Sequence, residues 1–286
     1  MKLIAMWALV LPLVCAAQKK DSKGAETHHS ILASYDLSEK KPLRLTLPTQ
    51  LSEASGLAFT PDGRLFSHGD ERGVVYQIDY SQGTIIKQFS LGSFGVKDDF
   101  EDIAIVDKIF YMVTSNGTLF EFSEGDDRQR VEFKKYQTSL SAKNDVEGLA
   151  YDPATSSLLL ACKGSPGYGY DRLRAIYSFS LKSKELFKKP RFLISLETVT
   201  RNSARGEFKP SGIALHPKSK TFFVIAAHGE SIVELSADGK LLAQQTINPK
   251  ANPHPEGIAF APDLTLLLCN DGQGKPGSIS LYKFKN

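Results

Sequence analysis

Three glutamates occupy the same place in a short motif that recurs along this chain. Glu101, Glu147 and Glu256 each stand directly before the marker position of one copy, and Ser55 and Ser211 stand there in two other copies. Carboxylates that a fold brings together disfavour one another's ionisation, and a bound cation relieves this repulsion. Oxygen ligands of this kind suit calcium better than zinc. We predict a calcium site at the three glutamates; the alternative is that they only accept hydrogen bonds from loop amides.

The motif also predicts the fold. Its marker residues are separated by 46, 46, 64 and 45 residues, and a period in the mid-forties with strand-like content is typical of β-propeller blades. We therefore predict an all-β, five-bladed β-propeller of four-stranded antiparallel blades, with six blades as the alternative. The markers are Gly56, Asp102, Gly148, Gly212 and Gly257.

The first repeat shows how one blade is made. Short apolar segments separated by tight turns predict strands at 56–59, 64–67, 74–79 and 84–89. The second, third and fourth repeats have the same order of segments and turns. Each repeat should therefore supply one blade, with its first strand lining the central channel.

The last repeat ends at Asn286 one strand short of a complete blade. Two segments before the first repeat, 31–37 and 43–47, have the alternating pattern of a hairpin. We predict that 43–47 pairs beside 279–284 and supplies the missing strand, because closing the ring leaves few open strand edges.

One face of this propeller should carry the chemistry. Successive strands alternate in direction, so the loops between blades and the loops between second and third strands share a face, where the five motif residues converge. Loops on a rigid scaffold are where binding residues concentrate, although Asn-Gly, Asp-Gly and His-Gly are also ordinary turn residues. The ligand-binding face that we predict around the glutamates comprises Ser55, Asp70, Glu71, Ser211, His228 and Asp271.

Further polar residues should reach the same face. A second ring lies two residues upstream of the first: Glu53, Asp99, Asp145, Lys209 and His254. The two long insertions, 163–172 and 197–209, also fall on this side. They offer tyrosines and basic side chains that could meet a small molecule or a partner in the cell envelope.

The N-terminus predicts export. Met1-Lys2 and an apolar run over 3–14 are followed by Cys15-Ala16-Ala17, which is the pattern of a secretory signal peptide and is too short to span a bilayer. We expect a signal peptide at 1–17, a flexible leader at 18–29 and a single domain at 30–286. The protein should be periplasmic or associated with the cell envelope, and a lipid anchor at Cys15 is the alternative to simple cleavage.

Intact-mass measurement of protein from its native host checks this expectation. Simple cleavage should remove residues 1 to about 17, whereas a lipoprotein should begin at a diacylated Cys15. A mature protein that still carries Met1 would contradict both forms of export.

The amino-acid composition limits the classes of partner that we expect for this protein. The formal charge is +3 and the lysines are scattered, so the sequence shows no basic patch of the kind that binds nucleic acid. We expect the protein to be a monomer. Cys162 and Cys269 both lie in apolar runs, which favours two buried thiols over a disulfide.

The strand starts carry a resemblance to a known family. Glu-Gly-Leu-Ala at 147–150, Ser-Gly-Ile-Ala at 211–214 and Asp70-Glu71-Arg72 resemble the SdiA-regulated family of exported bacterial proteins. The motifs are shared with NHL-type blades, lactonases and esterase-like phytase relatives. The resemblance implies a five-bladed propeller with a calcium site behind an export or membrane segment, and no established activity. Asp102 in place of glycine and the two insertions depart from the pattern.

Catalysis would need a base or nucleophile beside the metal. His68, His228 and His254 are the candidate bases, but Gly-x-Ser-x-Gly does not occur in the sequence, and neither Ser55 nor Ser211 has an orienting triad. We therefore predict a non-enzymatic binding or scaffold module, and a calcium-dependent esterase, lactonase or phytase-like hydrolase is the alternative.

Overall fold

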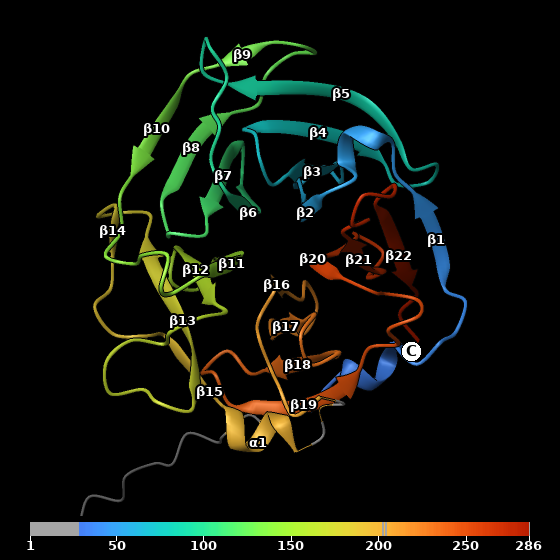
Figure 1. Cartoon of the computed structure of the whole chain (residues 1–286), viewed down its shortest axis with the longest axis vertical. Helices are drawn as coiled ribbons and strands as arrows, with labels where there is room; N and C mark the ends of the chain where they lie inside the picture. The colour runs from blue at the N-terminus through green and yellow to red at the C-terminus, as the bar shows by residue number, and fades with distance from the viewer. Residues whose placement is uncertain (1–28, 202, 204, 286) are drawn as a thin grey trace, which may run out of the picture.

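The computed structural model describes residues 29–201, 203 and 205–285. The predicted signal peptide at 1–17 and nearly all of the leader at 18–29 lie outside the described residues. Within these ranges the chain forms five small sheets arranged in a ring around a central channel (Figure 1). This confirms the five-bladed β-propeller that the repeats predict. No helix in the described ranges is long and apolar enough to cross a membrane.

Each blade is a mainly antiparallel sheet whose first strand lies nearest the channel. Blade 1 contains β2 (Ala54–Phe59), β3 (Leu65–Gly69), β4 (Val74–Asp79), β5 (Thr84–Leu91) and β9 (Arg130–Val131); blade 2 contains β6 (Phe100–Val106), β7 (Ile109–Thr114), β8 (Leu119–Ser123) and β10 (Phe133–Tyr136). Blade 3 contains β11 (Val146–Asp152), β12 (Ser157–Cys162), β13 (Leu173–Ser180), β14 (Glu185–Leu186) and β15 (Phe192–Ser195), and α1 (Leu196–Thr200) follows it. Blade 4 contains β16 (Gly212–Leu215), β17 (Phe222–Ala226), β18 (Ser231–Leu235) and β19 (Leu241–Thr246); blade 5 contains β20 (Pro255–Phe260), β21 (Leu266–Asn270), β22 (Ser278–Tyr282) and β1 (Leu43–Thr46).

The ring closes as predicted, with an N-terminal strand completing the last blade. Strand β1 pairs antiparallel with β22, so that Leu43 lies opposite Leu281 and Thr46 lies opposite Ser278. This pairing covers the outer edge that β22 would otherwise expose. The first and last parts of the propeller domain are therefore held in one sheet.

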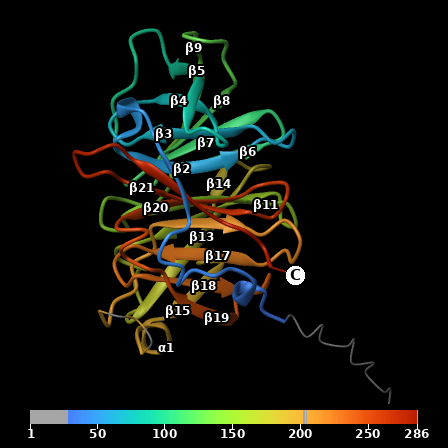
Figure 2. The ribbon, with the colours of Figure 1, turned by 90° about the vertical axis from the view of Figure 1, so that its right-hand side faces the viewer.

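The segment at 31–37 is not a strand, so the hairpin predicted there is wrong. Leu32–Ser34 forms the short 3-10 helix η1, which lies beside β19 (Figure 2). The buried carboxylate of Glu234 accepts hydrogen bonds from the backbone N–H groups of Ile31 and Leu32, both at 2.9 Å. Because these two N–H groups donate to a buried carboxylate, they do not pair with a neighbouring strand. This explains why the alternating sequence at 31–37 does not form a β-strand.

The hydrophobic core is divided among the blade interfaces. Each of the five core clusters joins one blade to the next around the ring. Between blades 1 and 2, for example, the rings of Phe66 and Phe110 meet edge to face with centroids 5.0 Å apart. Cys162 and Cys269 are free, buried thiols, as their apolar surroundings predict. Because both faces of the blades are packed, the strands that line the channel form a rigid frame.

Candidate functional site

The channel-lining strands begin with an irregularity that explains the motif. The antiparallel pairing shifts register between Phe100 and Asp102, between Val146 and Gly148, and between Pro255 and Gly257. The residue skipped in each case is Glu101, Glu147 or Glu256. A β-bulge leaves such a residue unpaired and changes the direction of its side chain. Strand β2 has the same kind of shift around Ser55.

The marker glycines are needed because neighbouring blades approach closely here. A Cβ atom on Gly212 would lie 2.9 Å from the carbonyl oxygen of Glu256, and one on Gly257 would lie 2.6 Å from the carbonyl oxygen of Ser55. Both oxygens belong to the next blade around the ring. The small marker residues thus allow the channel strands to converge, which in turn brings the bulge residues together.

Asp102 replaces the marker glycine in blade 2 and bonds this blade to blade 3. Its carboxylate accepts hydrogen bonds from the N–H of Ile103 at 2.8 Å and from the N–H of Leu149 in blade 3 at 2.6 Å. On its other side, the missing side chain of Gly56 in blade 1 leaves room for the Asp102 oxygen. Burial raises the pKa of Asp102 well above its usual value. This departure from the repeat is therefore a structural connection between blades.

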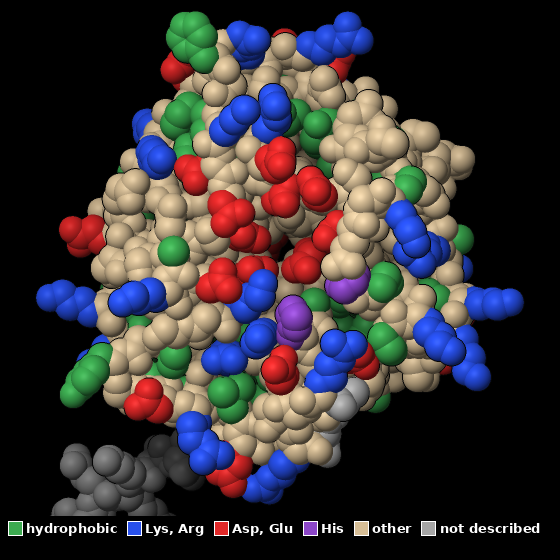
Figure 3. Space-filling view, viewed as in Figure 1, with side chains coloured by type: hydrophobic (Ala, Val, Ile, Leu, Met, Phe, Trp, Pro, Cys, Tyr) green, Lys and Arg blue, Asp and Glu red, His purple; other side chains and the backbone are tan. Residues whose placement is uncertain are grey.

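An acidic cavity of about 230 Å³ occupies the mouth of the channel. In Figure 3 the acidic side chains of this face gather around the central opening. Blades 1, 2, 3 and 5 contribute to a lining of seven carboxylates, one hydroxyl and one ammonium group: Glu53, Ser55, Asp70, Asp99, Glu101, Glu147, Lys163, Glu256 and Asp271. The three predicted glutamates and three of the six predicted face residues, Ser55, Asp70 and Asp271, are thus together in one cavity.

Lys163 opens the insertion 163–172 that the sequence places on this face, but its ion pair with Glu147 inside the cavity was not predicted. Its Nζ lies 2.7 Å from Oε1 of Glu147, and its backbone N–H donates to the carbonyl of Asp145 at 2.7 Å. Lys163 directly follows strand β12, as Asp70 follows β3 and Asp271 follows β21. That shared position could have identified it, because residues at equivalent points of successive blades reach the same face.

Burial and mutual repulsion change the ionisation of the glutamates. The pKa of Glu101 is raised to about 10, first by burial and then by the charges of Glu147 and Asp99. Burial, followed by repulsion from Glu147, raises the pKa of Glu256 to about 8. Burial also raises the pKa of Glu147, although Lys163 opposes this effect. Near neutral pH, protons therefore neutralise part of the cavity, and an entering cation would have to displace them.

Other predicted residues lie outside the lining of the cavity. The Ser211 hydroxyl donates to the carbonyl of Pro255 at 2.7 Å and accepts from the N–H of Ala227 at 3.1 Å, so it holds blade 4 against blade 5. Glu71 does not line the cavity, although its charge adds to the charge of Asp70 and to burial in raising the pKa of Glu53. His228 forms a backbone bridge with Lys209 at the rim.

The three candidate bases do not line the cavity. The buried ring of His68 places Nδ1 2.9 Å from the carbonyl oxygen of Gly69, and burial lowers its pKa to about 4. Burial also lowers the pKa of His228, and Lys209 contributes to this shift. Neither these histidines nor His254 is among the residues that line the cavity. A base acting there would have to be a carboxylate or Lys163.

The cavity offers the oxygen ligands that calcium prefers, but these ligands are not grouped around one point. Its lining contains oxygen donors and no histidine or cysteine, which is the ligand type of a hard divalent cation. In the described part of the chain, no group of three His, Cys, Asp or Glu side chains has the arrangement of a ready metal site. The Lys163 ammonium group holds Glu147 at present. A metal ion would need Glu147 to exchange this partner.

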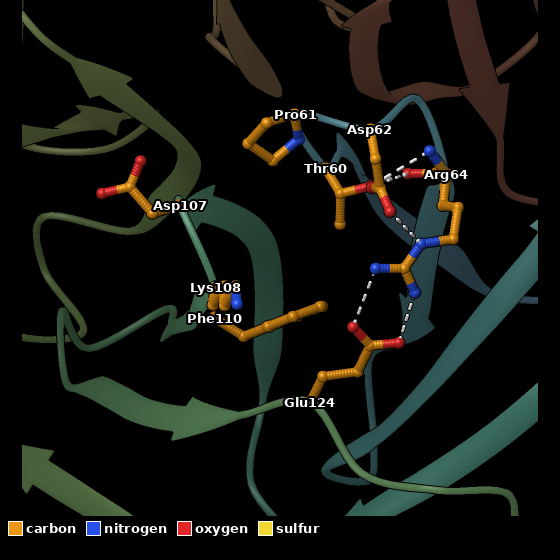
Figure 4. A pocket seen from close by; sticks show the side chains of 8 residues that line it. All are labelled: Thr60, Pro61, Asp62, Arg64, Asp107, Lys108, Phe110 and Glu124. Atoms are coloured by element: carbon orange, nitrogen blue, oxygen red, sulfur yellow. Dashed lines mark hydrogen bonds and ion pairs between the residues drawn. The ribbon is translucent and has the colours of Figure 1, made fainter.

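A second cavity lies at the opposite end of blades 1 and 2, between their first turns (Figure 4). It has a volume of about 340 Å³. The Arg64 guanidinium group bonds to Asp62 at 2.9 Å and to Glu124 at 3.0 Å. Lys87 pairs with the same Glu124 carboxylate. Because these charges satisfy one another, we assign them to the contact between blades 1 and 2. The lining residues are Thr60, Pro61, Asp62, Arg64, Asp107, Lys108, Phe110 and Glu124.

Comparisons with known proteins support the fold. No protein-family model and no curated protein sequence matches this chain. Glutaminyl cyclase from Myxococcus xanthus is a structural neighbour with a TM-score of 0.54 and 14% identity, over 85% of this chain and 95% of that one. A luciferin-regenerating enzyme has a TM-score of 0.53 and 11% identity over the same two shares. The PQQ-bound aldose sugar dehydrogenase of Streptomyces coelicolor has a TM-score of 0.51 and 13% identity, over 86% and 99%. At these identities the likeness concerns the β-propeller fold alone.

Proposed function

We propose that this protein is a calcium-binding β-propeller of the SdiA-regulated type, exported to the cell envelope, where it acts as a binding or scaffold module. The observation that carries the proposal is the convergence of seven carboxylates on one small cavity with a single ammonium group. Buried like charges are costly unless a cation or protons neutralise them. A divalent cation would neutralise the cluster more completely than Lys163 alone.

The bulge glutamates would hold the ion. Glu101, Glu147 and Glu256 come from separate blades, so an ion bound by all three would tie those blades together. Calcium accepts six to eight oxygen ligands in flexible geometry, and Asp70, Asp271 and Ser55 offer further oxygens from the same lining. Magnesium demands a tighter octahedral shell and should be a poor substitute.

The contacts of the cavity favour binding over catalysis. Ser55 supplies the only hydroxyl among the lining residues, and its Oγ is 3.4 Å from the carbonyl oxygen of Glu53. A hydrolase would need a nucleophile in contact with a base. No histidine lines the cavity to act as this base. A calcium-dependent esterase or lactonase remains the alternative, to be tested by turnover.

Calcium titration of the parent protein and of Glu147→Gln tests the proposal. The substitution keeps the shape of the side chain and removes one charge. Calorimetry should show saturable calcium binding to the parent protein with release of protons, and binding at least tenfold weaker in the variant. The melting temperature of the parent should rise with calcium concentration, because the ion binds only the folded state.

Glu207→Gln is the matched control, because Glu207 lies on the same face but does not line the cavity. It should bind calcium like the parent protein. Absence of calcium binding to the parent would refute the calcium proposal. Hydrolysis of simple esters or lactones that appears with calcium and disappears in Glu147→Gln would instead favour the enzyme.

A further inference from the structure

A cavity of about 620 Å³ lies on blade 3 at the end opposite the acidic mouth. Its polar side chains are three hydroxyls and three cations, and no carboxylate is among the lining residues. The lining is Thr155, Ser157, Ser178, Phe187, Lys188, Lys189, Pro190 and Arg191. Its chemistry is therefore the reverse of that of the acidic cavity.

An irregular outer strand creates this cavity. Strand β13 pairs first with β14, where the N–H of Phe187 donates to the carbonyl of Ser178 at 2.9 Å. Pairing with β15 resumes at Ile176, whose carbonyl accepts from the N–H of Arg191 at 2.7 Å. Residues 188–190 therefore span a gap in which β13 has only Tyr177. The extra residues bow away from the sheet and leave a hollow beside Ser178.

The cations of this hollow have no acidic partners. Lys188, Lys189 and Arg191 take part in no ion pair within the described residues, whereas Arg64 in the cavity between blades 1 and 2 has two. The Arg191 guanidinium group stacks on Phe192 at 5.0 Å and donates a hydrogen bond to the carbonyl of Ala237 at 3.3 Å. Positive charge without neutralising carboxylates attracts an anionic group.

Donors and an apolar surface accompany these charges. Ser157 and Ser178 are both buried. The Ser157 hydroxyl already donates to the carbonyl of Thr155 at 3.2 Å, and the Thr155 hydroxyl donates to Asp152 at 2.7 Å, whereas the described residues offer the Ser178 hydroxyl no such partner. Phe187 beside them is 55% exposed. Charge-assisted bonds from lysine and arginine, together with hydroxyl donors, recognise tetrahedral oxyanions. An exposed aromatic ring can carry the ring or apolar part of the same ligand.

We propose that this cavity binds a phosphate or sulfate group of a ligand whose apolar part lies against Phe187. The Ser178 hydroxyl donates to one oxygen of the group, and Lys188, Lys189 and Arg191 neutralise its charge. The site is independent of the acidic cavity, because the two have no lining residue in common. An anionic ligand and a cation could therefore be bound at opposite ends of the propeller.

Calorimetric titration with inorganic phosphate, in the presence of a calcium chelator, tests the site. The parent protein should bind phosphate saturably. Lys188→Gln/Lys189→Gln should weaken binding at least tenfold, and Ser178→Ala should weaken it several-fold without any change of charge. The control, Lys182→Gln/Lys218→Gln, removes two cations outside the lining and should bind like the parent.

Three results of the phosphate titration would overturn the proposal. A parent protein that does not bind phosphate has no such site, and equal losses in the test and control pairs would show attraction by overall charge only. An unchanged affinity in Ser178→Ala would show that the hollow makes no specific contact.

Vesicles of phosphatidylglycerol and phosphatidylcholine then identify the source of the group. Co-sedimentation that Phe187→Ser and Lys188→Gln/Lys189→Gln both abolish indicates a lipid headgroup, and its absence indicates a soluble ligand.

Discussion

Replacing Gly257 by alanine should destabilise the protein by about 3 kcal/mol or more, in the range of severe overpacking. The added Cβ would lie 2.6 Å from Sγ of Cys269 and 2.6 Å from the carbonyl oxygen of Ser55. The sulfur belongs to a buried side chain and the oxygen to the backbone of the neighbouring blade. Relief therefore requires blades 1 and 5 to move apart at the place where the ring closes.

Chemical denaturation of the variant and of two controls checks this expectation. Gly69→Ala should be close to neutral, because its Cβ would meet only an oxygen at 3.6 Å, an ordinary contact. Adding Cys269→Ala to Gly257→Ala should restore only part of the stability, since the backbone contact with Ser55 remains. A Gly257→Ala protein with an unchanged unfolding midpoint would refute the close approach of the two channel strands.

Glu101→Gln should stabilise the calcium-free protein at alkaline pH. The pKa of Glu101 is about 10 in the folded state, mainly because of burial, whereas an unfolded glutamate titrates near its ordinary value of 4.5. Between these values the folded protein keeps a proton that the unfolded chain has lost. The stability of the parent therefore falls as the pH rises from about 4.5 toward 10, and below about 4.5 this penalty is absent.

The glutamine variant lacks this penalty. At about pH 9 we expect it to be more stable than the parent by about 2 kcal/mol or more, since each unit of pKa difference corresponds to about 1.4 kcal/mol. At about pH 5 the two proteins should be nearly equal. Unfolding free energies measured across this range with a calcium chelator test the prediction, and Glu207→Gln should follow the parent. Calcium should reverse the order of stabilities at high pH, because it binds the parent more tightly.

A Glu101→Gln protein that is less stable than the parent at every pH would contradict this account. It would show that the carboxyl group makes a necessary hydrogen bond, as in the alternative in which the glutamates only accept bonds from loop amides. Equal stability at all pH values would show that Glu101 is in contact with water.

The sequence by itself determined the number of blades, the closing strand and the place of the acidic cavity. These features depend on a pattern that occurs once in each blade. The motif period gives the number of blades, and the incomplete last repeat indicates that 43–47 must supply a strand. The shared position of Glu101, Glu147 and Glu256 puts them at the channel mouth, because rotation about the propeller axis carries each copy onto the next.

Only the tertiary structure decided how the side chains of different blades meet. Distances between segments far apart in the chain decide that Ser211 bonds to blade 5 and does not line the cavity. They also decide that Lys163 reaches Glu147. The same holds for 31–37, where a buried carboxylate in blade 4 takes the backbone donors that an alternating pattern assigns to a strand. Local patterns contain no information about such partners, because the energy of a buried polar group is set by the atoms that surround it after folding.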